Sequence, residues 1–266
     1  MKRIYLYMYG VLAFTAQSVM AECPASEEVR LQVLGSGGPE MGDRRASSGY
    51  LIWQGGRAVI MVDAGSGTAL NFEHSGASIT DLRAVLFSHF HVDHSVDFPS
   101  LVKASYFTGR DRDLPVFGPA GNDRVPPASE FVATLIGSAG AYRYLSGYLG
   151  ADGEESYRIT VTDVPLEPRK VQRYQVDEKI SVAAIPTHHG PIPAIAWRVD
   201  IGQCSISFSG DMSNRYKTLA ALARDSDLLV AHNVIPEGAS GAARALHMPP
   251  SEIGTIAADA EVGQLV

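Results

Sequence analysis

The sequence predicts an α/β fold in which two β-sheets pack face to face and helices cover their outer sides. Three observations favour this architecture. The chain has 266 residues, 45% hydrophobic and 19% charged, which is the composition of a globular protein with a sizeable core. Short runs rich in β-branched and aromatic residues recur in both halves of the chain. Segments with helical periodicity separate these runs, as expected for sheets with helices on the outside.

The N-terminal segment differs in composition from the rest of the chain. Two basic residues precede an uncharged apolar run over 4–19, and Val19 and Ala21 occupy the small-residue positions of a cleavage site. An uncleaved membrane anchor is the alternative, but the run is short for a membrane span. We therefore predict a signal peptide over 1–21, a mature domain over 22–266, and export to the periplasm or out of the cell. No stable membrane insertion is expected after cleavage.

Charge and cysteine content restrict the partners and the compartment. Removal of 1–21 changes the formal net charge from −7 to −9, because that segment holds two positive charges and no negative ones. A nucleic-acid partner is not expected for an acidic exported protein that lacks a broad basic face. The only two cysteines, Cys23 and Cys204, lie in the mature domain. They could form one disulfide or remain as two thiols, and the sequence leaves both options open.

The first half is predicted to hold strands and one helix. Gly55 and Gly56 supply the turn of a hairpin between two of the strands. The expected strands cover 29–35, 48–54, 57–65, 82–89 and 114–119, and the helix covers 95–107.

The second half shows the same alternation of strand and helix patterns. Its expected strands cover 180–190, 193–200, 204–211 and 226–233, and its helices cover 214–225 and 250–261.

The segment over 121–179 between these halves has a different character. It contains one helical pattern at 129–137 and is otherwise rich in Gly, Tyr and Ser, so we predict an insertion without clear strands that serves as a lid or a substrate-binding loop. Tyr142, Tyr144 and Tyr148 either line a pocket or pack the insertion onto the body.

Three of the eight histidines fall within the short stretch "HFHVDH" at 89–94. In an extended segment residues i and i+2 point the same way, so His89 and His91 can face one metal ion. Asp93 and His94 follow at the expected start of a helix and can reach a second ion. Imidazole and carboxylate ligands favour zinc, with iron or manganese as alternatives. Solvated loop histidines are the alternative interpretation, which a position at the end of a buried strand disfavours.

This H-x-H-x-D-H pattern resembles that of the metallo-β-lactamase superfamily. Further motifs resemble its ribonuclease Z and arylsulfatase-like branch, and they occur in the same order along most of the mature chain. The resemblance implies a four-layer αββα sandwich. The matching segments are 34–40, 44–52, 62–68, 185–198, 208–211 and 246–254.

The resemblance also implies which residues hold two divalent metal ions. The first ion would be held by His89, His91 and His189, the second by Asp93 and His94, and Asp211 would bridge the two ions. His188 competes with His189, which is preferred because "HGP" matches the short turn and proline that follow the family's histidine. Asp63 would hydrogen-bond a ligand imidazole from behind and orient it.

The reaction implied by the family is hydrolysis by a hydroxide that bridges the metals. Asp93 would orient this nucleophile or take its proton, and His247 would donate a proton to the leaving group. The predicted substrates are phosphodiesters or related small anionic esters, including aryl sulfates. The alternatives are a lactonase or β-lactamase acting on a neutral ring, a ribonuclease Z-type endonuclease, and a metal-binding protein without turnover.

Two departures from the ribonuclease Z pattern bear on these alternatives. Asn233 stands where that enzyme carries the glutamate that supports its proton-donor histidine. The long basic arm that grips tRNA has no counterpart in this sequence. The scaffold therefore does not by itself predict tRNA processing.

The resemblance also implies a metal ligand near the C-terminus. In this branch the strand after the last helix ends in a histidine that completes the second metal site, whereas this sequence stops at Val266. We expect the natural chain to continue past Val266, with His247 as the substitute ligand if it does not. The oligomeric state is left open, with a homodimer as one option.

Overall fold

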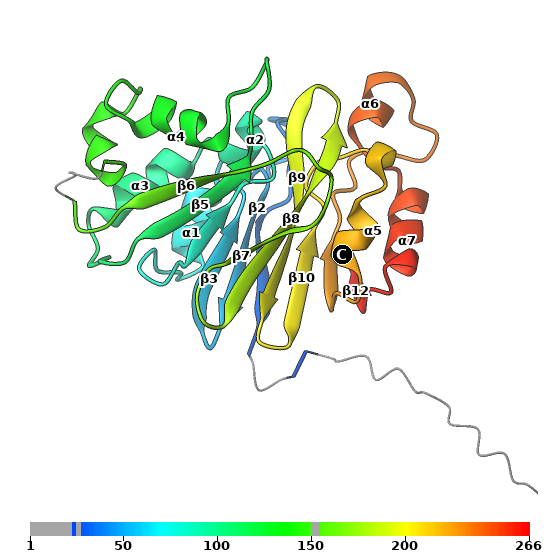
Figure 1. Cartoon of the computed structure of the whole chain (residues 1–266), viewed down its shortest axis with the longest axis horizontal. Helices are drawn as coiled ribbons and strands as arrows, with labels where there is room; N and C mark the ends of the chain where they lie inside the picture. Colours follow the sequence, from blue (N-terminus) through cyan, green and yellow to red (C-terminus); the bar gives the residue numbers. More distant parts are fainter. Residues whose placement is uncertain (1–22, 25–27, 151–154) are drawn as a thin grey trace, which may run out of the picture.

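The computed structural model describes residues 23–24, 28–150 and 155–266, so the predicted signal peptide lies outside it. Within these residues, a pair of six-stranded sheets packs face to face, and helices cover the outer face of each sheet (Figure 1). The fold class expected from the sequence is confirmed.

The first sheet has the strand order β1-β2-β3-β4-β5-β6. Its first three strands are antiparallel neighbours, and the pairs from β3 to β6 are parallel. Because parallel strands end at the same edge of a sheet, the segments that follow β3, β4 and β5 come together there. The strands are β1 (Arg30–Gly35), β2 (Gly49–Gln54), β3 (Arg57–Val62), β4 (Ala84–Leu86), β5 (Leu114–Pro119) and β6 (Ile159–Val164).

The second sheet has the order β12-β11-β10-β9-β8-β7. The strands from β7 to β10 are antiparallel, while β10, β11 and β12 run parallel. The ends of β10 and β11 therefore also lie at one edge. The strands are β7 (Gln172–Gln175), β8 (Ile180–His189), β9 (Ile192–Ile201), β10 (Cys204–Phe208), β11 (Leu228–Val230) and β12 (Gln264–Leu265).

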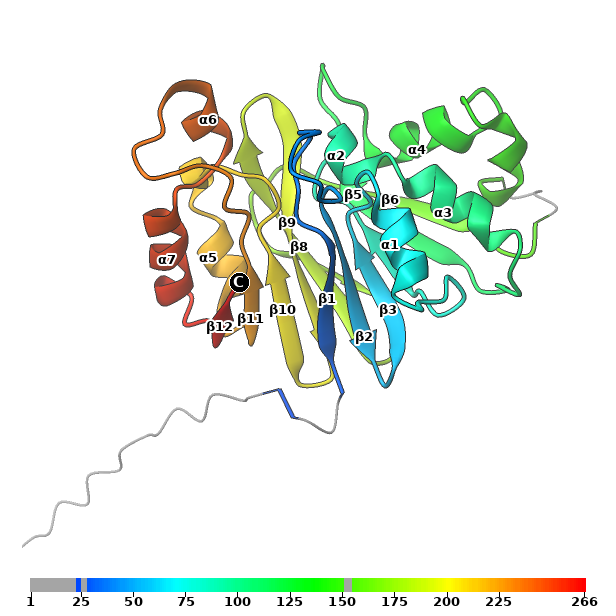
Figure 2. The ribbon, with the colours of Figure 1, turned by 180° about the vertical axis from the view of Figure 1, so that it is seen from behind.

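The helices complete the four layers, as the views from both sides show (Figures 1 and 2). Helices α1 (Thr68–His74), α3 (Phe98–Ser105) and α4 (Ala128–Ile136) lie beside the first sheet, and α5 (Leu219–Ala223) and α7 (Pro250–Asp259) lie beside the second. The short helices α2 (Val92–Ser95) and α6 (Gly241–Leu246) both lie at the same end of the sandwich. None of the helices among the described residues has the length and apolarity needed to span a bilayer.

Trp197 of β9 joins the two sheets beneath that end. Its side chain is fully buried in the core between the sheets, against residues that include Ile60 and Phe208. Its indole Nε1 donates a hydrogen bond to the carbonyl oxygen of Phe87 at 2.9 Å. Because Phe87 immediately precedes the histidine-rich loop, the second sheet anchors the start of that loop.

The structure corrects the prediction for 121–179, which does contain strands. Residues 159–164 form β6, which pairs with β5 along its whole length, and 172–175 form β7. The β-branched alternation of "ITVTDV" supports β6, and the Gly- and Tyr-rich residues before it obscured this pattern. The predicted role of the remaining segment as a lid is untested.

The three tyrosines of this segment separate into two groups. Tyr148 is buried in the core under the first sheet, next to Tyr157. Tyr142 and Tyr144 are exposed. Tyr144 lies in the first turn of the 3₁₀-helix η2 (Arg143–Tyr148), and Tyr142 is the residue before that helix. Of the two roles considered for these tyrosines, Tyr148 therefore has the packing role.

The helices differ from the prediction in their bounds and in number. The helix expected at 95–107 is present in shorter form as α3, and α2 is a separate turn of helix before it. The helix expected at 214–225 is divided into η3 (Asn214–Tyr216) and α5. Helix α6 was not predicted, because its six residues are too few to show a periodic pattern.

Cys23 and Cys204 form a disulfide, which decides between the two options left open by the sequence. The backbone N–H of Cys23 also donates to Asp227 at 2.9 Å, and Asp227 accepts from Ser205 next to Cys204. The start of the described chain is thus attached to β10.

Candidate metal centre

The loop after β4 brings two histidines of the stretch 89–94 together. Nε2 of His89 lies 3.0 Å from Nδ1 of His91, as expected from their i, i+2 spacing. His89 is fully buried, and Oγ of Ser88 lies 3.1 Å from its other ring nitrogen. The two imidazoles therefore point at a common position from the first sheet.

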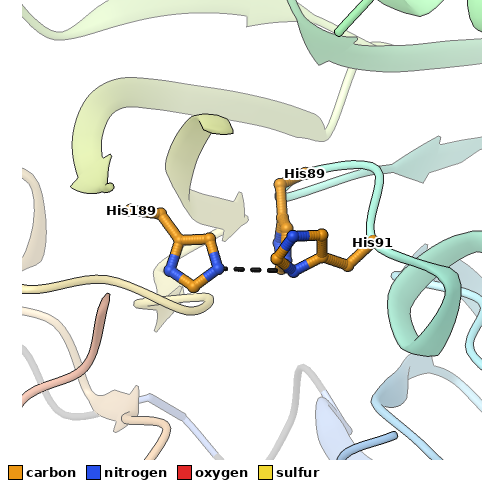
Figure 3. Close-up of side chains that lie close together, drawn as sticks. All are labelled: His89, His91 and His189. Carbon is orange, nitrogen blue, oxygen red and sulfur yellow. Dashed lines mark hydrogen bonds between the residues drawn. The ribbon is translucent and has the colours of Figure 1, made fainter. Parts of the chain in front are cut away.

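His189 at the end of β8 reaches the same position from the second sheet (Figure 3). Its Nε2 lies 3.4 Å from Nδ1 of His91, and its Nδ1 lies 3.0 Å from the carbonyl oxygen of Leu246. A carbonyl only accepts, so Nδ1 carries the proton and Nε2 presents a lone pair to the cluster. His89, His91 and His189 form one group of potential ligands.

His188 points to the opposite side of the strand, as alternation along β8 requires. Its Nδ1 lies 2.7 Å from Oγ of Ser213, and its ring packs on Tyr216. The sequence favoured His189 over His188, and the geometry places only His189 in the cluster.

A second group consists of His89, His94 and Asp211. His94 lies in α2, and its Nε2 is 3.6 Å from Oδ2 of Asp211 and 3.7 Å from Oδ2 of Asp93. Asp211 follows the glycine turn after β10, with Gly210 at φ 58° in the left-handed region. The two groups share His89, so they adjoin each other.

A third group contains His189, Asp211 and His247. His247 follows α6, and its Nδ1 lies 3.8 Å from Oδ2 of Asp211. Among the described residues this buried nitrogen has no hydrogen-bond partner. Asp211 belongs to the second and third groups, and each of these shares one histidine with the first group.

Burial controls the protonation of the first group. It lowers the pKa of His89 well below the usual histidine value and lowers the pKa of His189 to about 4. Both rings are therefore neutral at pH 7, which is the form that binds a metal.

The second group is more strongly charged. Burial disfavours the imidazolium form of His94, but Asp63 and Asp211 outweigh burial and raise the pKa of His94 to about 10. Burial likewise disfavours the carboxylate of Asp211, while the hydrogen bond from His232 and the nearby imidazolium of His94 hold the pKa of Asp211 well below its usual value. In the metal-free protein a proton on His94 thus occupies the place that a cation would take.

The donor set fits divalent metal ions. The nitrogen separations of 3.0 and 3.4 Å in the first group match the spacing of about 3.3 Å between ligands in tetrahedral coordination with Zn–N bonds of roughly 2.05 Å. The unpartnered Nδ1 of His247 is a further donor directed at Asp211. The cluster therefore offers the nitrogen and carboxylate donors that divalent metal ions bind.

The structure also shows two contacts that the sequence did not reveal. His232, after β11, places Nδ1 2.8 Å from Oδ1 of Asp211, and Tyr50 of β2 places its hydroxyl 2.9 Å from Nε2 of His232. The parallel pairing of β10 with β11 makes Asp211 and His232 neighbours. A histidine at the end of a predicted strand was the available indication, but strand order is not visible in one sequence.

The cluster opens into a pocket of about 760 Å³. Its wall includes apolar side chains such as Val33, Pro39, Val230 and Leu246, together with acidic Glu40 and Asp43. Arg45 is the cationic side chain at its rim, and its Nε already donates to Asp43 at 2.9 Å. Asn233 lines the pocket at an exposed position.

A family profile described as the beta-lactamase superfamily domain matches residues 59–266, which include all the clustered histidines and Asp211. The chain belongs to this superfamily. The solved structures similar to it include the metallo-beta-lactamase fold protein YhfI from Bacillus subtilis, at 22% identity and a TM-score of 0.67, with 89% of this chain and 83% of that chain covered.

Members of the superfamily related to this chain include ribonuclease Z from Mycobacterium sp. (strain KMS). It is 29% identical over 211 residues, which cover 76% of this chain and 67% of that protein. Human tRNase Z, short form, has a TM-score of 0.72 at 18% identity, with 89% of this chain and 91% of that chain covered. The chain is thus a superfamily member with ribonuclease Z homologues, as expected from its motifs.

Proposed function

We propose that this superfamily hydrolase uses two divalent metal ions, with zinc as the expected metal, to cleave phosphodiester or related anionic ester bonds. The observation that supports this most is the pair of adjoining donor groups that share His89, one of which contains Asp211. His89, His91 and His189 would hold one ion, Asp93 and His94 the other, and Asp211 would bridge them. Two ions in these positions would lower the pKa of a water molecule and neutralise an anionic substrate.

The protein's own groups around the donors favour specific roles. Asp93 is buried and lines the pocket, where it would orient or deprotonate an attacking water. Burial lowers the pKa of His247, so its ring is neutral at pH 7 in the metal-free protein. The proton-donor role predicted for His247 therefore requires a bound anion that raises this pKa again.

The pocket favours a small ester with one negative charge and an apolar substituent. Among the described residues, the only lysine or arginine that lines the pocket is Arg45, and Asp43 neutralises it. Glu40 and Asp43 would repel additional phosphates, whereas Val33, Val230 and Leu246 provide an apolar wall. Polyanionic RNA would need cationic contacts elsewhere on the surface.

Turnover of four substrates by the metal-replete protein tests this proposal. We expect hydrolysis of bis-p-nitrophenyl phosphate first and p-nitrophenyl sulfate second, with an acyl-lactone and a cephalosporin slower. Asp211→Asn should remove most of the activity while circular dichroism stays unchanged. A faster rate on the lactone or the cephalosporin would instead support a hydrolase of neutral rings.

Ribonuclease Z activity is the second candidate, because the related Mycobacterium protein carries that name. A precursor tRNA cleaved with a kcat/KM above that for bis-p-nitrophenyl phosphate would favour it. No cleavage of either substrate by protein that contains two metal ions would leave a metal-binding protein without turnover.

We also propose that the protein is exported. The Cys23–Cys204 disulfide supports an oxidising compartment, where such bonds persist. Sequencing of the N-terminus after expression in a bacterial host checks the proposed cleavage after Ala21. An uncleaved N-terminus in the cytoplasmic fraction would contradict it.

A further inference from the structure

His232 lies next to the central carboxylate because of the strand order. Strands β10 and β11 are parallel, with Phe208 opposite Val230. The pairing continues past the strand ends, where Oγ of Ser209 accepts from the backbone N–H of His232 at 3.0 Å. The side chain of His232 is therefore held beside Asp211.

Each ring nitrogen of His232 has its own partner. Nδ1 lies 2.8 Å from Oδ1 of Asp211, and a carboxylate only accepts hydrogen bonds, so Nδ1 is the donor. Nε2 of the neutral ring then accepts from the hydroxyl of Tyr50 at 2.9 Å. Tyr50 reaches His232 from the first sheet, and its ring also packs on Phe208. The contact therefore spans both sheets.

The two oxygens of Asp211 consequently face different groups. Oδ1 accepts from His232, whereas Oδ2 faces Nε2 of His94 at 3.6 Å and Nδ1 of His247 at 3.8 Å. Rotation of the carboxylate would break the bond to His232. His232 belongs to none of the donor groups among the described residues. Each of its ring nitrogens has a partner of its own.

We propose that His232 is a positioning residue that holds Oδ1 of Asp211 and so reserves Oδ2 for the metal ions, with Tyr50 fixing the tautomer that makes this possible. The inference rests on the proposed two-metal function and adds a residue that controls its bridge. Partners behind a metal ligand commonly change metal affinity 10- to 100-fold.

A pair of substitutions separates the two nitrogens of His232. In His232→Asn the amide nitrogen lies near the position of Nδ1 and can still donate to Asp211. In His232→Gln the amide lies near the position of Nε2 and keeps only the contact to Tyr50. We expect His232→Gln to lower the affinity for the second ion at least tenfold. The affinity of His232→Asn for that ion should stay within about threefold of wild type. The affinity of Tyr50→Phe for the second ion should lie between the values of the two His232 variants.

The measurement is a Co²⁺ titration of chelator-treated protein, followed by absorbance and by ion content. Loss of the donor should also change the visible spectrum of the second Co²⁺ ion. In the metal-free protein, NMR should show a hydrogen-bonded Nδ1 proton on His232 that Tyr50→Phe makes exchange faster. His74→Gln, at an exposed position at the end of α1, is the matched control and should match wild type.

Three results would overturn the inference in different ways. If wild type binds two ions and His232→Gln binds both with unchanged affinity and spectrum, His232 does not position the bridge. Equal losses in His232→Asn and His232→Gln would show that the ring fills space and does not act as a donor. If wild type binds fewer than two ions, the proposed function fails and this inference fails with it.

Discussion

Asp63 accepts a hydrogen bond from His94, with 2.7 Å between Oδ2 and Nδ1, and both side chains are buried. The same carboxylate accepts from the backbone N–H and the hydroxyl of Ser88 at 2.7 and 2.8 Å. Asp63 thereby joins the end of β3 to the histidine-rich loop at 88–91 and to α2. It adopts φ 55°, a left-handed conformation in a residue type that tolerates it.

The first prediction concerns the charge of this carboxylate. Asp63→Asn should lower the affinity for the second metal ion about 10- to 100-fold. The reason is that the amide no longer stabilises the His94 tautomer in which Nε2 is free to bind the ion. Metal affinity is to be measured by competition with a chromophoric chelator. Asp163→Asn is a matched control, because Asp163 accepts from the backbone N–H and hydroxyl of Ser129 in the same way but contacts no histidine among the described groups. Equal losses in the two variants would contradict the prediction.

The second prediction ranks the two adjacent histidines of β8. His189→Ala should lower activity and the affinity for the first ion by more than about 100-fold, beyond the range expected for a residue behind a ligand. His188→Ala removes the contact to Ser213 and should mainly lower the free energy of unfolding, by about 1 kcal/mol. Kinetics and ion content of both variants decide the order, and the reverse ranking would refute it.

The sequence was informative where one segment alone determines the geometry. His89, His91 and His94 belong to one short stretch, and their spacing in an extended segment followed by a helix predicts that they converge. Most strands were predictable because runs such as β8 and β9 are long and rich in apolar residues. A hydrogen bond between Asp63 and an imidazole was predicted from a motif, and the structure contains it between Asp63 and His94.

Features that depend on strand order were not predictable in the same way. Tyr50 and His232 lie 182 residues apart and meet only because the two sheets pack together. Strand β6 depends on its pairing with β5, so its own short sequence gave a weaker indication than the Gly-rich residues around it. The metal-ligand assignments are predictions that the geometry supports and that metal analysis has to test.

The third prediction concerns pH and the metal-free protein. His189 has a folded pKa of about 4 and His94 one of about 10, against about 6.5 for histidine in an unfolded chain. Below pH 6.5 the unfolded state binds the extra proton of His189, so stability should fall on acidification. Above pH 6.5 the folded state loses the benefit of charged His94, so stability should fall again as the pH approaches 10.

Urea unfolding of chelator-treated protein at pH 5, 6.5 and 8.5 measures this dependence. The highest free energy of unfolding is expected near pH 6.5. His189→Gln should flatten the acid side, and Asp63→Asn should flatten the alkaline side. A stability that rises steadily from pH 5 to 8.5 would be inconsistent with the expected charge on His94.

The fourth prediction concerns the disulfide. Cys23→Ala should lower the free energy of unfolding by about 2–4 kcal/mol, because the bond closes a loop between residues that are 181 positions apart. The metal site lies at the opposite end of the sandwich from the bond, so the affinity for both ions should stay within about twofold of wild type in folded protein. Urea unfolding and metal titration of the same sample test both expectations. An unchanged midpoint in urea would count against a stabilising role.

The last prediction tests the close packing that places α2. A Cβ atom on Gly65 would lie 2.0 Å from the carbonyl oxygen of Asp93, which is backbone and cannot turn aside. Gly65→Ala should therefore push the start of α2 outward and move Asp93 and His94 away from Asp211. The affinity for the second ion should then fall more than the affinity for the first. The overpacking should also cost about 1–3 kcal/mol of stability. Gly109→Ala is the control, because a Cβ there meets nothing within 4 Å. Loss of stability without any change in the second ion's affinity would show that the ligands of α2 tolerate the displacement.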